Sequence, residues 1–337
     1  MTTISPKQTA TADDVAALAG VSRWTVTRAF KRDASISEKS RAKVMEAAEK
    51  LGYAPDLQAS SLASDRSNLV AVLVDDFTNP HKLVMLERLT RILRKAGFDS
   101  LLVNTIDKGD AESALLNASQ RRVDSAILLG TSFDDSVLQT ALGARRVKKL
   151  IIFARRSQHP NTISICVDDA QAMVQLTDYV YEKGYRKPMF MAGPNTYSAH
   201  LMRQDTFVRR WIELTGEEPE VTEVGVYDSN KAYYVTDEIL RSRSKEDRPD
   251  VFVCENDAIA IGTLDCVRHG HKIAVPEEIA VTGFDDVELA SNPNYDLTTF
   301  RQPISEMAEA LVDVLQSTEE KSDLEKFGGY LVVRSSA

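Results

Sequence analysis

The sequence lacks most of the features that would place a protein in a membrane or outside the cell. Its 337 residues contain only three cysteines, Cys166, Cys254 and Cys266, which are scattered along the chain. An odd, unclustered set predicts a reduced protein without a disulfide framework. No apolar run approaches the ~18–20 residues that cross a bilayer, and the polar first residues lack the apolar segment of a signal peptide. We expect a cytoplasmic protein without a membrane partner.

Sequence motifs that indicate an enzyme are also absent. No G-x-G-x-x-G follows an expected strand, and neither a G-x-x-x-x-G-K-[ST] phosphate loop nor a G-x-S-x-G elbow occurs. His269 and His271 do not have metal spacing on a helix, and the pair Cys266 and His269 has no third ligand adjacent to it. The sequence therefore predicts a protein that is not an enzyme and that uses neither a metal nor a cofactor.

Charge is distributed unevenly along the chain. The formal net charge is −9, but residues 1–64 carry an excess of two positive charges and the remainder carries −11. A basic N-terminal segment on an otherwise acidic chain is expected if only that segment binds a polyanion. The alternative explanation is chance variation in charge among solvent-exposed surfaces. At roughly 100–200 residues per domain, the length predicts two or three domains.

The first sixty residues have the pattern of three short helices. Thr11, Ser22 and Ser37 are N-cap residues, each followed by apolar residues at helical spacing, and Gly20 separates the first two helices. Two short helices joined by a tight turn form a helix-turn-helix, whose second helix enters the DNA major groove by its N-terminal end.

The outward side chains of the second helix are suited to DNA. Arg23, Trp24, Thr27 and Arg28 face outward if Val26, Ala29 and Phe30 face inward. Arginine can bond a guanine edge, and the hydroxyls of Ser22, Thr25 and Thr27 suit phosphate oxygens. Trp24 either contacts bases or lies half-buried against the third helix.

From residue 69 onward, short apolar runs alternate with helical patterns. This alternation predicts an α/β body with two doubly wound parallel-sheet lobes and a cleft between them. The expected strands are Leu69–Val74, Ser100–Asn104, Ser125–Leu129, Lys149–Phe153, Ile163–Val167, Pro188–Ala192, Val221–Val226, Val251–Cys254, Ile279–Thr282 and Leu297–Phe300. Polar residues follow several of these strands, where such folds bind ligands, although helix N-capping explains Asp, Asn and Thr there equally well.

Two long segments carry a resemblance to a known family. TADDVAALAGVSRWTVTRAF followed by ISEKSRAKVMEAAEKLGYAPD resembles the headpiece of LacI/GalR-type transcriptional repressors, and ENDAIAIGTL, VTGFDD and LTTFRQP resemble signatures of their body. The resemblance covers nearly the whole chain. It implies an all-α helix-turn-helix headpiece (1–56), a hinge helix or linker (57–68) and a two-lobed body of the periplasmic-binding-protein type (69–337). Lobe 1 is expected at about 69–162 plus 301–326 and lobe 2 at about 163–297.

The resemblance also implies which residues contact DNA. Arg23, Trp24 and Arg28 occupy base-reading positions, and paired hinge helices would place Leu62 as an apolar wedge in the minor groove; a plain flexible linker is the alternative. The expected DNA contacts are Thr11, Ser22, Arg23, Trp24, Thr25, Thr27, Arg28, Ala59 and Leu62.

By position, the resemblance places an effector site in the cleft, with Arg203 opposite Asp257. Where the family often has two aromatic residues after Asn79-Pro80, this chain has His81 and Lys82. With Arg155 nearby, these residues indicate an anionic effector, unless His81 and Lys82 simply lie on the helix surface. The expected effector contacts are Phe77, His81, Lys82, Arg155, Arg203, Tyr227, Asn256, Asp257 and Gln302.

Together these features predict a repressor that binds double-stranded operator DNA as a homodimer or as a dimer of dimers. Its affinity for DNA would be controlled by a sugar, sugar acid or sugar phosphate bound between the lobes. A purine- or nucleoside-responsive regulator of the same type is one alternative. A solute-binding protein shares the body but should carry a secretory signal and no helix-turn-helix, and a sugar-metabolising enzyme should carry a nucleotide-phosphate loop.

Overall fold

The computed structural model describes residues 10–31, 34–55, 66–105, 110–130, 147–157, 159, 161–194, 199–200, 202–317 and 327–337. The chain divides into two compact units, Met1–Ser67 and Asn68–Ala337. The expected hinge contacts Ala59 and Leu62 lie outside the described residues.

The first unit contains the three predicted helices, α1 (Ala12–Ala19), α2 (Arg23–Ala29) and α3 (Glu38–Leu51). Thr11 and Asp14 form a capping box at the start of α1, which satisfies backbone donors that the helix itself leaves unpaired. Gly20 ends α1 with φ 64°, in the left-handed region that glycine adopts without a steric penalty. Val15, Val26 and Val44, one from each helix, are fully buried in a shared core.

The second unit begins with a sheet of five parallel strands. Their order is β2 (Asp99–Asn104), β1 (Leu69–Val74), β3 (Ser125–Leu129), β4 (Lys149–Phe153) and β6 (Ile163–Ile165). Helices α5 (Pro80–Lys95) and α12 (Ile304–Gln316) pack on one face and α6 (Asp110–Gln120) packs on the other. Since successive strand residues point to opposite faces, both faces of β1 are apolar and buried.

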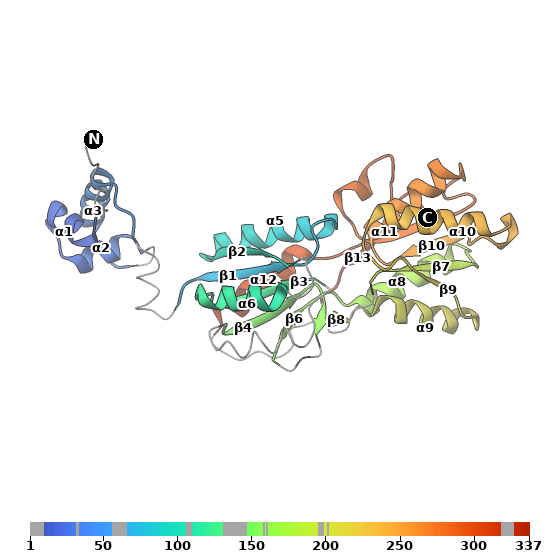
Figure 1. The fold of residues 1–337 in the computed structure, drawn as a ribbon, viewed down its shortest axis with the longest axis horizontal. Helices are drawn as coiled ribbons and strands as arrows, with labels where there is room; N and C mark the ends of the chain where they lie inside the picture. Colours follow the sequence, from blue (N-terminus) through green and yellow to red (C-terminus); the bar gives the residue numbers. More distant parts are fainter. Residues whose placement is uncertain are drawn as a thin grey trace, which may run out of the picture. The chain divides into compact units, whose positions relative to one another are not determined.

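The second sheet has six strands, of which only β13 is antiparallel to its neighbour. Their order is β13 (Tyr330–Val332), β12 (Thr298–Arg301), β11 (Ala280–Asp285), β10 (Val251–Cys254), β7 (Pro188–Ala192) and β9 (Glu220–Glu223). Helices α10 (Ser229–Ser242) and α11 (Asp257–Asp265) cover one face, and α8 (Asp169–Glu182) and α9 (Arg203–Thr215) cover the other. Figure 1 shows the helices on both faces of each sheet.

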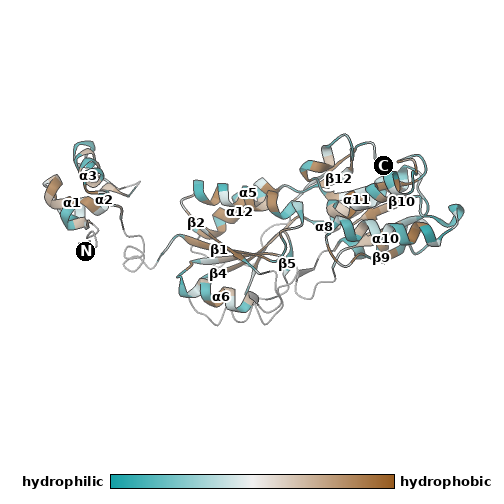
Figure 2. Ribbon diagram, turned by 45° about the horizontal axis from the view of Figure 1, so that its top comes forward, coloured by the Kyte–Doolittle hydropathy of each residue, from teal (hydrophilic) through white to brown (hydrophobic). Residues whose placement is uncertain are grey.

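Short elements complete the second unit. They are the two-stranded ribbon of β5 (Arg156–Ser157) and β8 (Ala199–His200), the 3₁₀ helices η1 (Lys245–Asp247) and η3 (Glu288–Ser291), and the π-helix η2 (Cys266–Gly270). In Figure 2 the strands β1 and β10 are brown, whereas the helices around them combine teal and brown, as expected for elements with one solvent-facing side. No described helix is long and apolar enough to cross a membrane.

The predicted fold class is confirmed, but the predicted lobe boundaries need correction. The strand Ile163–Ile165 lies in the first sheet and not in lobe 2, because its residues pair with Ile151–Phe153 of β4. Residues 298–301 and 330–332 belong to the second sheet. The chain therefore passes between the lobes three times, from β6 to α8, from β12 to α12, and from α12 to β13.

Candidate DNA-binding surface and effector cavity

The second helix of the headpiece presents a polar and aromatic outer face. Ser22 caps α2 by accepting a hydrogen bond from the backbone N–H of Thr25 at 3.2 Å. The Ser22 and Thr25 hydroxyl oxygens are 2.9 Å apart, and the Thr27 hydroxyl donates to the Arg23 carbonyl at 3.1 Å. Arg23 is exposed and pairs with Asp13 at 3.3 Å.

Trp24 and Arg28 form one stacked unit on this face. Trp24 is 66% exposed, so the explanation that it packs half-buried against the third helix is wrong. The Arg28 guanidinium lies 4.3 Å from the centre of the indole ring and donates through Nη2 to the carbonyl of Ser35 at 2.8 Å. Its Nε is buried and has no hydrogen-bond partner within the described part of the chain. Exposed tryptophan supported by a cation is the arrangement expected of a ligand-contacting surface rather than of a core.

Arg41 was missed by the sequence analysis. Its guanidinium, from α3, donates to the backbone carbonyls of Ala29, the last residue of α2, and of Lys31 and Ala34, which follow it. Arg41 therefore positions the end of the second helix, and only the family pattern around it gave any signal.

Replacing Arg28 by alanine should reduce affinity for the operator about 1–3 kcal/mol more than affinity for a random duplex. Arg28 has an uncommitted Nε and also supports Trp24. Fluorescence anisotropy with an operator selected from a random pool measures both affinities, and Lys43→Ala on the exposed face of α3 is the control. Equal losses on both duplexes would show that Arg28 contacts only phosphate.

The carboxyl ends of the strands in the second unit meet around one small cavity. Its lining comes from both lobes and from the segment after β12: Asn79, His81, Lys82, Met85, Leu129, Gly130, Phe153, Ala154, Arg155, Arg203, Tyr227, Asn256, Asp285 and Gln302. The cavity measures about 30 Å³, room for about one or two water molecules. Seven of the nine expected effector contacts lie in this lining.

His81 and Lys82 are buried at the start of α5, so the explanation that they lie on the helix surface is wrong. The Lys82 ammonium forms an ion pair with Asp75 at the end of β1 and lies 4.0 Å from Asp76. Burial lowers the pKa of His81, an effect that Asp285 opposes. The imidazole Nε2 is 3.2 Å from the Gln302 amide nitrogen; because that amide only donates, the imidazole accepts.

Arg203 has a different carboxylate partner from the one expected. Its Nε donates to Asp169 at 2.8 Å and its Nη1 to the Glu255 carbonyl at 2.9 Å. Its guanidinium also lies 3.6 Å from the centre of the Phe284 ring. Arg203 is therefore held within lobe 2 by Asp169, which begins α8, rather than by Asp257.

Asp257 is bonded within lobe 2 and does not line the cavity. Its two carboxylate oxygens accept from the Thr299 hydroxyl at 2.6 Å and from the Val287 N–H at 2.9 Å. Burial, with Asp285 adding to it, raises the pKa of Asp257 well above its ordinary value. Asp257, which was expected to contact the effector, instead links α11 to η3 and β12 through these hydrogen bonds.

Two other expected effector contacts also have structural roles. Asn256 caps α11, accepting from the Ile259 N–H at 3.0 Å, although it still lines the cavity. Phe77 packs against the apolar cluster of lobe 1 and is not part of the lining. Helix capping thus explains Asn256, as the sequence analysis allowed.

Asp257→Ala should lower the free energy of unfolding by about 2–3 kcal/mol, because it leaves a buried N–H and a buried hydroxyl without their acceptor. Asp257→Asn is the matched control, since it keeps one acceptor oxygen at the same place. Urea unfolding followed by far-UV circular dichroism measures both. If Asp257→Ala is as stable as the wild type but no longer responds to the effector, Asp257 contacts the effector after all.

Arg155 differs from the other cations of the cavity. It is 7% exposed, and its Nη2 donates a long hydrogen bond to the Tyr227 hydroxyl at 3.4 Å. Its Nη1 is buried without a hydrogen-bond partner in the described residues. The Gln302 Oε1 is likewise buried and unpartnered, while its amide nitrogen donates to Asp285 at 2.7 Å. The cavity therefore offers one unused cationic donor and one unused neutral acceptor.

Sequence reasoning also missed the acids behind the cations and the apolar walls. Asp169, Glu255 and Asp285 surround Arg203, and burial raises the pKa of Asp169 and of Glu255 although Arg203 opposes this. These acids were visible as polar residues after strands, but their partners were not. Met85, Leu129 and Phe153 supply the apolar walls.

The fold and these two surfaces define a class of protein, in which a helix-turn-helix headpiece is joined to a two-lobed effector domain. The model of the lacI family of bacterial regulatory proteins matches residues 11–56, and that of the periplasmic binding protein-like domain matches residues 177–336. The chain thus carries a helix-turn-helix domain of the lacI family followed by a periplasmic binding protein-like domain.

Known proteins resemble it over nearly its full length. The ribose operon repressor of Escherichia coli (strain K12) is 29% identical over 324 residues, covering 91% of this chain and 92% of that protein. The HTH-type transcriptional repressor PurR of Vibrio atlanticus (strain LGP32) is 26% identical over 322 residues, covering 94% of each. The structure of the Lac repressor dimer bound to operator and the anti-inducer ONPF has a TM-score of 0.82 at 22% identity, covering 98% of this chain and 99% of that one.

Proposed function

We propose that this protein is a transcriptional repressor whose affinity for operator DNA is set by a small polyhydroxylated anion, a sugar acid or sugar phosphate, bound between its two lobes. The observation that carries the effector class is the buried, unpartnered Nη1 of Arg155. A buried guanidinium donor without an acceptor is costly, and a carboxylate or phosphate is the group that satisfies it best.

The remainder of the cavity supports a hydroxylated ligand. The unpartnered Oε1 of Gln302 accepts from a hydroxyl, and the neutral His81 beside it, whose Nε2 accepts from Gln302, donates through its other ring nitrogen. Lys82 and Arg203 are already paired with carboxylates, so Arg155 is the cation of this lining that is left to bind the anion.

The headpiece supports binding to duplex DNA through Ser22, Arg23, Trp24, Thr25, Thr27 and Arg28. Thr11 is the N-cap of α1 and bonds Asp14, so its contribution to DNA binding rests on position alone. A homodimer places two headpieces on a near-palindromic operator, and the operator-bound Lac repressor dimer supports that arrangement. We assign the protein to the cytoplasm, where its DNA lies.

The test is operator binding by the full chain in the presence of a metabolite panel. An operator is selected from a random duplex pool, and its affinity is measured with sugar acids, sugar phosphates, neutral sugars and purines. We expect a change of at least about tenfold with one anionic sugar, because an effector acts only through its different affinities for the DNA-bound and free states.

Each other outcome has a defined meaning. A response to a neutral sugar alone, or to a purine, would reject the anionic class while keeping the regulator. If the chain prefers no selected sequence over a random duplex, whichever metabolite is present, the proposal that it is a repressor is rejected.

A further inference from the structure

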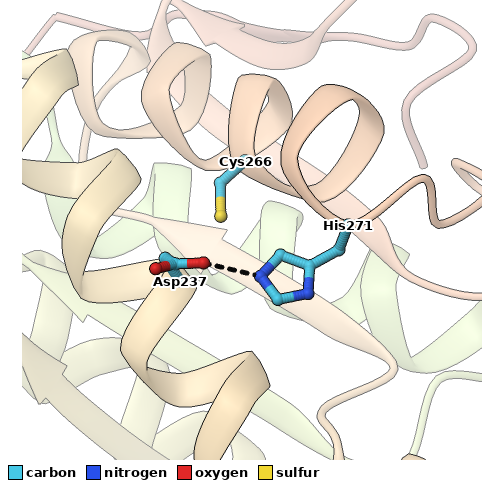
Figure 3. A group of neighbouring side chains, drawn as sticks. All are labelled: Asp237, Cys266 and His271. Carbon is cyan, nitrogen blue, oxygen red and sulfur yellow. Dashed lines mark hydrogen bonds and ion pairs between the residues drawn. The ribbon is translucent and has the colours of Figure 1, made fainter.

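Three side chains with metal-binding atoms converge in lobe 2, away from the effector cavity. Asp237 comes from α10, Cys266 begins the π-helix η2, and His271 caps its end. Their ligand atoms all lie within 4.8 Å of one another. Figure 3 shows the Cys266 sulfur pointing toward the Asp237 carboxylate and the His271 imidazole.

The π-helix creates this arrangement. The His271 N–H donates to the Cys266 carbonyl at 2.9 Å, which aligns residues five apart. In a regular α-helix of 3.6 residues per turn, five residues span about 1.4 turns, so the two side chains would point in different directions. A single wide turn of this kind often marks a functional position. At three residues' spacing His269 is the expected partner of Cys266, but the wider turn places His271 there instead.

We propose that Asp237, Cys266 and His271 bind a zinc ion. One carboxylate oxygen, one imidazole nitrogen and one thiolate are the ligand types that zinc prefers, and three protein ligands leave a fourth position for water. As the zinc–sulfur bond forms, the thiol proton is released to solvent. The hydrogen bond between His271 Nε2 and Asp237 Oδ1, now 2.8 Å, is replaced when both atoms turn to the ion.

The site is partly open to solvent through two of its three side chains. Cys266 is 0% exposed and forms the floor, whereas the side chains of His271 and Asp237 are 16% and 20% exposed. Arg241, whose side chain is 74% exposed, pairs with Asp237 at 3.0 Å and can leave without losing a buried contact. Burial raises the pKa of the Cys266 thiol to about 12, so the ion itself must drive deprotonation, and binding should strengthen as pH rises.

The site joins two helices that lead back to the effector cavity. α10 begins directly after the cavity residue Tyr227 and its cap Asp228, and α11 begins directly after the cavity residue Asn256. From Asn256 to Cys266 is ten residues, or about 15 Å along the helix. The ion would therefore fasten the second half of α10 to η2, which continues from the end of α11 that is remote from the effector cavity.

Cobalt substitution of the full chain, freed of metal with EDTA, tests the site. We expect one Co²⁺ per chain with a thiolate-to-cobalt charge-transfer band in the near ultraviolet, and displacement of that band by Zn²⁺. Cys266→Ala should abolish the band, and His271→Gln should weaken binding more than about 100-fold, since loss of even a residue that only hydrogen-bonds a ligand costs about 10–100-fold.

Matched controls separate the site from adventitious binding. His269→Gln changes an exposed histidine on the same turn, and Cys166→Ala removes a different buried cysteine; both should keep the band. Thermal unfolding without metal confirms that each variant folds. A wild-type chain that gives no charge-transfer band, or a band that survives His271→Gln at wild-type affinity, would overturn the proposal and leave the His271–Asp237 hydrogen bond as a structural contact between α10 and η2.

Discussion

Replacing Arg155 by methionine is expected to weaken binding of the anionic effector about 100- to 1000-fold, which corresponds to about 2.7–4.1 kcal/mol. The loss is large because a buried charged hydrogen bond to the ligand disappears and the anion is left without its partner. Stability should change little, within about 1 kcal/mol, because Arg155 Nη1 has no acceptor in the described protein and the bond that is lost, from Nη2 to the Tyr227 hydroxyl, is long at 3.4 Å. Calorimetric titration with the effector identified in the panel, together with thermal unfolding, measures both quantities.

The neighbouring Arg156 provides the matched control for this experiment. Arg156 has the same charge one residue further along, but its side chain is exposed on β5. Arg156→Met should keep the wild-type effector affinity. If Arg155→Met binds the effector as tightly as the wild type, Arg155 is not the anion contact; if both variants lose affinity equally, long-range attraction rather than direct contact is responsible.

Replacing Lys82 by methionine is expected to have the opposite balance of effects, lowering the free energy of unfolding by about 3–5 kcal/mol. Lys82 and Asp75 are both almost fully buried and form an ion pair. Removing one partner strands the other charge in a medium that solvates it poorly, and this costs far more than the intact pair contributes. Urea unfolding followed by far-UV circular dichroism gives the value.

The double variant Asp75→Asn/Lys82→Met is the control for this second result. It removes both charges at similar volume, so most of the lost stability should return. If Lys82→Met alone is as stable as the wild type, the Asp75 carboxyl must take up a proton without penalty, and the ion pair is not what holds the start of α5 in place.

The sequence predicted the strands well and the short pairings poorly. All ten expected strands start within one residue of the observed ones, because buried parallel strands are continuous apolar runs bounded by polar residues. The ribbon of β5 and β8 and the edge strand β13 were missed, since each is only two or three residues long. Their formation depends on the neighbour that tertiary structure supplies.

At the candidate site, the sequence indicated residue types and positions but not partners. Asn256 and Asp257 are adjacent, yet one lines the cavity and the other bonds Thr299 and Val287 inside lobe 2. Arg203 pairs with Asp169, 34 residues earlier, and helical or strand periodicity contains no information on such a contact. Likewise the π-turn that brings His271 to Cys266 changes the helical spacing locally, so no motif search at α-helical spacing finds the pair.

The narrowness of the cavity has a kinetic meaning. A space of about 30 Å³ is far smaller than the few hundred cubic ångströms that a small-molecule ligand occupies. The side chains that line it must separate before a sugar can enter. The observed rate of binding should therefore stop rising at high metabolite concentration, where it equals the rate at which the two lobes open. The response time in the cell would then be set by opening of the two lobes and not by diffusion of the metabolite.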